Sequence, residues 1–408
     1  MVKAIAYGMS TLLGESETSL AAPVFFDPHY PILINKPPVT LITGSPGSGK
    51  TFSALIMAAQ SSVLGKLTFC LDPKGDFIAL KKLEDAGVLQ DVNIWSIFSD
   101  IDGSQINESN YGLLDPLQLT NDRAENIALT VDTIKALVQN VSNKQSTSLI
   151  PIVQDVAESS DPSLSRVVRK LQQSQDDDIR ALGLQLDVPM NMAISKLLVN
   201  TGAPNTENIF TRRKGLTVIN LMGLNLPSSD SDEKAYSVDE RLSTVIMRLI
   251  TLLVLDAMKS LPKKILKTLF IDEAWVVFGN AAGAAMIDQA ALLGRSLNMA
   301  TILATQSPTH IASRKDAEGR SSLDTTISTR LAFRNDSLMD NALTRKSLRL
   351  PDTQDNGWED LFTKLDTGQC VFKDCRGGLA IIHTIAPDSW ARAFDTNPAN
   401  ILKEHEDN

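Results

Sequence analysis

Short apolar runs and longer segments of helical period alternate along much of the chain. The apolar runs lie at residues 39–43, 67–71, 92–98, 216–221, 269–271 and 300–304. The segments of helical period that follow or separate them include 52–60, 242–260 and 282–293. Continuous apolar runs suit strands that are buried on both faces, and their alternation with helices is typical of βαβ units. The pattern therefore predicts an α/β fold with a mainly parallel sheet.

The pattern changes between residues 121 and 212, where the strand-like runs are lost. Helical periods with polar faces replace them, as in 124–138 and 163–172. Prolines are expected to divide this stretch into several helices, at Pro151, Pro162 and Pro189. We therefore predict an all-α insertion at 121–212 inside an α/β core. The ranges assigned to that core are 39–120 and 213–390.

The two ends of the chain differ from the core. Residues 1–38 are predicted to be a lead-in with short strands. Within them, 22–38 holds two β-like runs broken by prolines, which suits a hairpin at a sheet edge. The C-terminal part is predicted to contain helices at 338–348 and 358–365 and a hairpin made of 369–373 and 379–385. Residues 391–408 are expected to form a flexible tail.

Composition narrows the class of protein. A hydrophobic content of 43% is ample for a core, and a formal net charge of −9 argues against a protein that coats nucleic acid. Three cysteines are too few for a disulfide framework or a zinc site, which favours a reducing compartment. The acidic run Asp176–Asp178 favours a helix cap over a metal site. No apolar run reaches the ~18 residues that a membrane span needs, so any membrane association would be through a partner.

The strongest chemical signal is the stretch LITGSPGSGKT. It carries the spacing G-x-x-x-x-G-K-[ST] between a predicted strand and a predicted helix, which is the context that a phosphate loop requires. Glycines allow the backbone N–H groups to surround phosphate oxygens, and the helix N-terminus adds partial positive charge. The nucleotide-binding residues are therefore expected to be Gly44, Ser45, Pro46, Gly47, Ser48, Gly49, Lys50, Thr51 and Phe52. Lys50 is expected to reach the β- and γ-phosphates, and the Thr51 hydroxyl to bind Mg²⁺.

Polar residues follow three other predicted strands. Asp272 and Glu273 come directly after 269–271, where an Asp can hold the water shell of Mg²⁺ and a Glu can deprotonate an attacking water. Gln306 follows 300–304, a position suited to sensing a γ-phosphate. Asp72 begins DPKGD after 67–71, and on its own this segment is interpreted as an ordinary turn. The acidic pair favours nucleotide hydrolysis over simple nucleotide binding.

Taken in order, the phosphate loop, DPKGD, LFIDEAW, GRSLN, ATQSP and the hairpin FKDCRGG resemble the ATPase domain of TraC-like conjugation ATPases. These are the VirB-type motors of type IV secretion systems within the HerA/FtsK superfamily. The resemblance covers most of residues 22–390 and implies a RecA-like P-loop NTPase core with an all-α insertion. It also implies hydrolysis of ATP with Mg²⁺ by a homo-hexamer at the cytoplasmic face of the cell membrane. There such a motor works on membrane-embedded secretion components and powers substrate transfer or pilus biogenesis.

The resemblance also implies roles for single residues. Asp272 would hold Mg²⁺, Glu273 would be the catalytic base, and Gln306 would sense the γ-phosphate. Arg295 would be the finger inserted into a neighbour's site, and Arg376, in the hairpin turn, is the second choice for that role. Members of the family usually carry a large N-terminal docking domain, whereas almost nothing precedes the predicted core here. The chain is therefore expected to be either an excised domain or a short relative.

Two other functions stay open at this stage. A HerA/FtsK-type DNA translocase or packaging motor would place basic residues on pore loops, and the segment 313–320 is the one clustered candidate. A nucleotide-gated interaction module that does not hydrolyse ATP belongs to another class. The pair Asp272 and Glu273 argues against it, because such a module has no use for a catalytic base. The sequence does not identify the transported substrate, DNA or protein.

Overall fold

The computed structural model divides into two units, which are described separately below. The residues that it describes are 11–17, 22–99, 105–199, 214–227, 233–278, 290–306, 326–350 and 360–394. The first unit comprises Met1–Trp95, Thr211–Asn220 and Leu261–Asn408, and the second comprises Ser96–Phe210 and Leu221–Ser260. None of the helices in the described ranges is long and apolar enough to cross a membrane.

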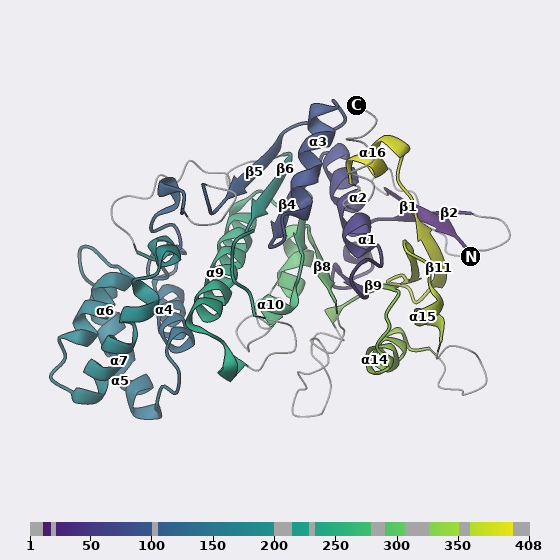
Figure 1. Cartoon of the computed structure of the whole chain (residues 1–408). Helices are drawn as coiled ribbons and strands as arrows, with labels where there is room; N and C mark the ends of the chain where they lie inside the picture. Colours follow the sequence, from purple (N-terminus) through teal and green to yellow (C-terminus); the bar gives the residue numbers. More distant parts are fainter. Residues whose placement is uncertain are drawn as a thin grey trace, which may run out of the picture. The chain divides into compact units, whose positions relative to one another are not determined.

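Eleven strands of the described residues form one sheet in the first unit (Figure 1). Its order is β2-β1-β11-β10-β9-β3-β8-β7-β4-β6-β5. The strands are β1 (Thr11–Ser16), β2 (Pro23–Phe26), β3 (Val39–Thr43), β4 (Leu67–Asp72), β5 (Val92–Ser96), β6 (Leu216–Asn220), β7 (Lys267–Ile271), β8 (Met299–Thr305), β9 (Thr329–Phe333), β10 (Gln369–Lys373) and β11 (Leu379–Thr384). The strands from β9 to β6 in this order pair in parallel, whereas β10, β11, β1 and β2 extend the sheet by antiparallel pairs. The predicted α/β class with a mainly parallel sheet is confirmed.

Strand order brings distant parts of the sequence to one edge of the sheet. Parallel strands end at the same edge, so the residues after β3, β8, β7 and β4 meet there. Because β10 is antiparallel to β9, its first residue and the last residue of β11 lie at this edge as well. The turn between β10 and β11 lies at the opposite edge, where the parallel strands begin.

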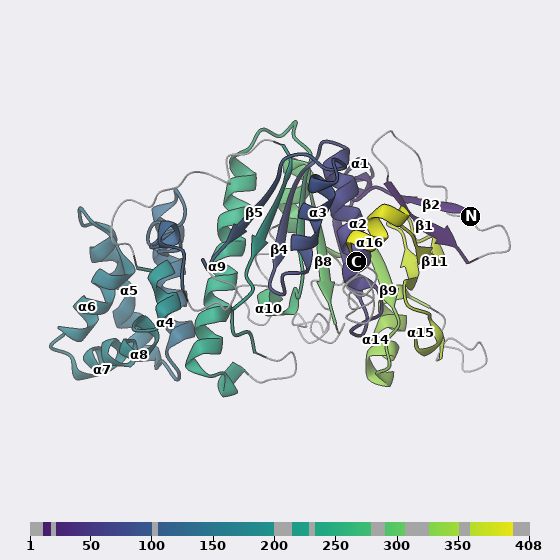
Figure 2. The ribbon, with the colours of Figure 1, turned by 45° about the horizontal axis from the view of Figure 1, so that its top comes forward.

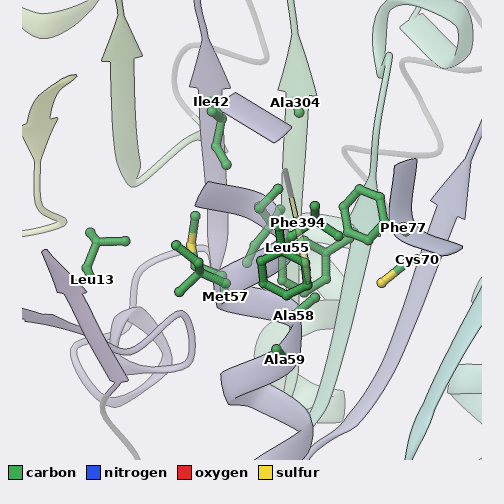
Figure 3. Packing of buried hydrophobic residues seen from close by; sticks show 14 of the residues in the cluster. Leu13, Ile42, Leu55, Met57, Ala58, Ala59, Cys70, Phe77, Ala304 and Phe394 are labelled. Atoms are coloured by element: carbon green, nitrogen blue, oxygen red, sulfur yellow. The ribbon is translucent and has the colours of Figure 1, made fainter. Parts of the chain in front are cut away.

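The helices of the first unit are mostly short. They are α1 (Tyr30–Leu33), α2 (Lys50–Val63), the 3-10 turn η1 (Asp76–Ala79), α3 (Leu80–Asp85), α10 (Trp275–Phe278), α14 (Leu338–Leu348), α15 (Leu361–Lys364) and α16 (Asp388–Ala393). One core cluster joins α2, α3 and the end of α16 to a single face of the sheet (Figure 2). In Figure 3, Leu55 and Ala58 of α2 lie among Ile42, Ala304 and Phe394. Burial of each large apolar side chain contributes about 1.5–3 kcal/mol to the stability of the fold. The position of α2 behind the loop that precedes it is therefore well fixed.

The second unit is helical in its described residues. Its elements are η2 (Glu108–Asn110), α4 (Arg123–Leu137), α5 (Asn143–Ala157), α6 (Leu164–Gln172), α7 (Asp177–Gln185), α8 (Asp187–Met190), η3 (Ala193–Leu197), η5 (Glu233–Ala235) and α9 (Val238–Ser260). Asp176 caps α7 by accepting hydrogen bonds from the N–H groups of Asp178 and Ile179, which confirms the predicted helix cap. The long helix α9 contacts α4, α8 and η3. The unit therefore differs from the predicted range 121–212, because it begins at Ser96 and includes α9.

Two sequence-based expectations about prolines are wrong. Pro151 lies inside α5 and does not break it. A proline inside a helix costs about 3 kcal/mol, and the burial of Leu149, Val153 and Val156 along the same helix outweighs that cost. The expected hairpin within 22–38 is also wrong, since Tyr30–Leu33 is helical and β2 pairs with β1 instead. The predicted flexible tail at 391–408 is wrong in its first residues, because α16 continues to Ala393 and Phe394 is buried in the core. The segments 282–289, 313–320, 358–359 and 395–408 lie outside the described residues.

Candidate functional site

The phosphate loop connects β3 to α2 and is shaped by glycines. A Cβ at Gly44 would lie 2.7 Å from the Cβ of Phe333, and a Cβ at Gly49 would lie 2.8 Å from the backbone nitrogen of Gly368. Gly49 also has a φ of 103°, which L side chains rarely adopt. Lys50 is the first residue of α2, so the loop leads directly into the N-terminus of a 14-residue helix. This is the geometry that binds phosphate groups.

Neighbouring segments hold the loop in place from both sides. The Ser45 N–H donates to the carbonyl oxygen of Arg334 at 2.8 Å, just beyond β9. On the other side, the Gly368 N–H donates to the Ser48 carbonyl oxygen at 3.0 Å, and the Thr367 hydroxyl donates to the Gly47 carbonyl oxygen at 3.4 Å. The loop is therefore anchored by residues that lie more than 280 positions later in the sequence.

Lys50 is buried with its ammonium group against the loop. Its Nζ donates to the carbonyl oxygens of Gly44 at 2.6 Å and Ser45 at 2.8 Å. Burial lowers the pKa of Lys50 to about 8, while the charges of Glu273 and Asp272 act in the opposite direction. Both acidic groups are thus close enough to interact with this cation across the site.

Asp272 and Glu273 follow β7, and both are buried. Burial, and then the charge of Glu273, raises the pKa of Asp272 to about 6. Its Oδ2 atom is buried and has no hydrogen-bond partner among the described residues. A buried carboxylate oxygen without a donor, lining the same cavity as the Thr51 hydroxyl, is suited to a hard cation such as Mg²⁺. These two residues fit the predicted metal site.

Glu273 accepts hydrogen bonds on both carboxylate oxygens. Oε2 accepts from Trp275 Nε1 at 2.6 Å, and Oε1 accepts from Gln306 Nε2 at 2.9 Å and from the ammonium group of Lys74. Burial raises the pKa of Glu273, but these donors outweigh burial and leave the pKa below its ordinary value. Glu273 also has a φ of 49°, an uncommon value for a residue with a side chain. The predicted pair of Glu273 and Gln306 is thus brought into direct contact.

A cavity of about 790 Å³ lies against the phosphate loop. One group of lining side chains is charged or polar: Lys50, Thr51, Lys74, Asp76, Asp272, Glu273 and Gln306. A second group is mostly apolar: Phe52, Leu55, Ala391 and Phe394, with His383 and Thr384 beside them. Phe52 and Phe394 meet edge to face, with ring centroids 6.3 Å apart. The cavity therefore combines a charged region suited to phosphates with an aromatic wall suited to the nucleobase of a nucleotide.

The comparisons with known proteins give the family and the fold. The family model described as "AAA-like domain" matches residues 34–394. The chain belongs to this family. With the phosphate loop and acidic pair in place, this makes it a P-loop ATPase. No curated protein sequence matches the chain.

Solved structures show the same fold as this AAA-like domain. VirB4 of Thermoanaerobacter pseudethanolicus is similar with a TM-score of 0.69 and 14% identity, over 93% of this chain and 97% of that one. The bacterial conjugative coupling protein TrwB, in its unbound form, is similar with a TM-score of 0.56 and 12% identity, over 93% and 91%. A structure of TrwB in complex with ADP and Mg²⁺ gives a TM-score of 0.56 and 12% identity, over 93% and 92%. The RecA-like P-loop core expected from the motifs is confirmed by these folds.

The two predicted arginines of the AAA-like domain lie away from its own cavity. Arg295 precedes β8 and donates from Nη2 to the Asn35 side chain at 3.1 Å, at the edge where the parallel strands begin. The Arg376 guanidinium lies 4.8 Å from the ring centroid of Tyr30, at the same edge. A strand of five to seven residues separates this edge from the cavity, roughly 16–23 Å. Neither arginine can serve its own phosphate loop in this position.

Sequence reasoning missed several residues of the site. Lys74, in the segment interpreted as an ordinary turn, contacts Glu273, and Thr367 and Gly368 support the phosphate loop. His383 and Phe394 line the cavity from the C-terminal part of the chain. The signal for Lys74 was its place directly after a strand, as for Asp272. No local pattern marks the C-terminal residues, since only strand order brings them to the site.

Proposed function

We propose that the chain hydrolyses ATP with Mg²⁺ as one subunit of an oligomeric motor for type IV secretion or conjugative transfer. The observation that carries the proposal is the convergence of Lys50, Thr51, Asp272, Glu273 and Gln306 on one cavity. These residues come from three strand ends and supply a cation, two carboxylates, a hydroxyl and an amide. Together they are the chemical groups that phosphoryl transfer to water requires.

Each group has a distinct task in the proposed reaction. The loop N–H groups and the start of α2 bind the phosphate oxygens, and Lys50 neutralises charge that develops on the β/γ oxygens. Glu273 orients the attacking water and accepts its proton. Gln306 donates to Glu273 and would contact the γ-phosphate as well.

Thr51 and Asp272 would hold Mg²⁺. The bound cation neutralises charge on the phosphate oxygens and orients them for attack. The unpartnered Oδ2 of Asp272 supports this assignment, because a metal or its water shell would satisfy that buried atom.

Hydrolysis is favoured over a module that only binds nucleotide. A binding module needs the loop and the cation site, but it does not need a carboxylate held beside them by three donors. Glu273 is fixed by Trp275, Gln306 and Lys74 at the edge of the cavity. That arrangement is expected of a base whose position matters for a reaction.

The assignment to secretion is the more distant part of the proposal. It rests on the fold shared with VirB4 and with the conjugative coupling protein TrwB, and on the order of the motifs. We propose a homo-hexamer that docks on membrane-embedded secretion components at the cytoplasmic face of the membrane. The positions of Arg295 and Arg376, far from their own cavity, support an assembly in which one subunit completes the site of the next. DNA contact belongs to the same proposal.

The test is the rate of phosphate release by the full chain and by Lys50→Ala, with and without DNA. Loss of the only lysine in the phosphate loop is expected to lower turnover by roughly 10²–10³-fold or more. Lys364→Ala is the matched control, because this lysine is 73% exposed and lies on α15. Turnover of Lys50→Ala equal to that of the control would refute the proposed hydrolysis at this site.

A further inference from the structure

The turn after β4 is rigid and fixes the backbone of Lys74 beside the acidic pair. Asp72, buried at the end of β4, accepts hydrogen bonds from the N–H groups of Gly75 at 2.8 Å, Asp76 at 3.1 Å and Phe77 at 2.8 Å. Phe77 is buried against Phe270, the residue two positions before Asp272, with ring centroids 6.2 Å apart. The interpretation of this segment as an ordinary turn is incomplete. It is a well-ordered turn that carries a cation to the cavity.

The side chain of Lys74 spans from this turn to Glu273. Its ammonium group contacts Glu273 Oε1. Burial lowers the pKa of Lys50, and the nearby charge of Lys74 adds to that effect. The Lys74 side chain is 49% exposed, whereas that of Glu273 is 7% exposed. The carboxylate is therefore held by the protein, while the lysine lies at the mouth of the site and can change partner.

The contacts of Glu273 limit what it can do as a base. Oε1 has two lone-pair sites, and the donors Lys74 and Gln306 occupy both of them. Oε2 accepts from Trp275 and keeps a second lone-pair site. Oε1 is therefore the oxygen whose acceptor sites are filled, and removing the Lys74 contact would open one of them to an attacking water.

ATP brings a stronger partner for Lys74 than Glu273. A γ-phosphate carries more negative charge than one carboxylate and offers three acceptor oxygens. Lys74 and Glu273 line the same cavity as the phosphate loop, so the lysine faces the space in which a phosphate group would bind. ADP lacks the group that would attract it.

We propose that Lys74 is a γ-phosphate ligand that also positions Glu273. It holds the carboxylate through Oε1 until ATP binds, and then turns to the γ-phosphate and frees that oxygen for the attacking water. The inference rests on the proposed ATP hydrolysis at this site. It adds a residue that distinguishes ATP from ADP and that links binding of the γ-phosphate to activation of the base.

The first experiment compares Lys74→Gln, Lys74→Arg and the parent. Affinities for a non-hydrolysable ATP analogue and for ADP are measured with Mg²⁺ by calorimetry on the full chain. Loss of one charge-assisted contact is expected to weaken analogue binding by roughly 10- to 100-fold. ADP binding should change less than about threefold. Lys74→Arg should keep most of the analogue affinity, because it keeps the charge.

The matched control is Lys81→Gln, which changes a half-exposed lysine of α3 that contacts Glu84 and does not line the cavity. Its two affinities should equal those of the parent. A Lys74→Gln variant that loses analogue and ADP affinity equally would have a structural defect, and one that loses neither would not bind the γ-phosphate. Either result overturns the inference. The proposed hydrolysis would still stand if Lys50→Ala abolished turnover.

A double-mutant cycle tests the exchange between partners. Glu273→Gln removes the charge that holds Lys74, so it should raise affinity for the ATP analogue. Adding Lys74→Gln should abolish that gain. A gain of the same size with and without Lys74 would mean that the two residues act independently, and it would refute the proposed exchange.

Discussion

Replacing Glu273 by Gln is the most direct test of the catalytic assignment. The change keeps the size of the side chain and removes its charge and its basicity. General-base assistance contributes about 10²–10⁴-fold to the rates of enzymes that use it. At 1.36 kcal/mol for each factor of ten, the expected loss of transition-state stabilisation is about 2.7–5.4 kcal/mol. Turnover should fall by that factor.

The structure indicates that the fold will tolerate this change. A Gln at this position can still accept from Trp275 through its oxygen, and its NH2 group can donate to Gln306 once the Gln306 amide turns to present its oxygen. The lost ion pair with Lys74 costs little stability, because that lysine is half exposed and water screens the interaction. Nucleotide binding should therefore be kept, and the inference about Lys74 predicts that the ATP analogue binds somewhat more tightly.

The assay measures phosphate release and analogue affinity on the same preparations of the full chain. Glu158→Gln is the control, since this exposed residue lies at the end of α5, in the other unit. A slow variant with undiminished affinity would identify Glu273 as the base. If affinity fell by the same factor as the rate, Glu273 would instead hold the metal or support the fold, and the reasoning would be wrong.

Two further predictions concern other parts of the first unit. Mixing Arg295→Ala subunits with Lys50→Ala subunits, each inactive alone, should restore part of the activity, because an arginine supplied in trans is worth roughly 10³–10⁵ in rate. Failure to recover despite demonstrated co-assembly would favour Arg376 as the finger. Lys66→Met should lower the free energy of unfolding by about 3–5 kcal/mol, because the fully buried ammonium lies 3.1 Å from Asp27 Oδ1. Urea unfolding measures the loss, and adding Asp27→Asn should restore much of it; a loss under about 1 kcal/mol would contradict this reasoning.

Of the residues that the sequence predicted at the site, Asp272 and Gln306 follow a strand directly, and Lys50 follows the loop after β3. A motif such as GSPGSGKT or DE indicates its chemistry within a few adjacent residues, and the apolar run before it predicts the strand. The parallel arrangement then brings the strand ends together, and Lys50, Asp272 and Gln306 line one cavity. To predict that these residues meet, one needs only the order of the neighbouring strands, in which β8 lies between β3 and β7.

The remaining parts of the site depend on pairings that no local pattern records. Gly368 supports the phosphate loop because β10 runs antiparallel to β9 and returns the chain to the same edge. Tertiary packing also overrides local preference, as in α5, which continues through Pro151. The sequence placed α9 in the α/β core, whereas it belongs to the second unit, for a similar reason. Its amphipathic pattern predicted the helix correctly but did not specify which elements it packs against.

The β10–β11 hairpin connects the cavity to the opposite edge of the sheet. At one end, Gly368 donates to the phosphate loop and accepts from the Thr384 N–H at 2.9 Å. At the other end, Asp374 accepts from the N–H groups of Arg376 at 2.9 Å and Gly378 at 2.6 Å, which fixes the turn. Five paired residues join the two ends without a break, so a shift of the phosphate loop would be carried along the hairpin to Arg376. This gives a mechanical reason to include Arg376→Ala in the mixing experiment, because an arginine on this hairpin would report the nucleotide state of its own subunit to the site that it serves.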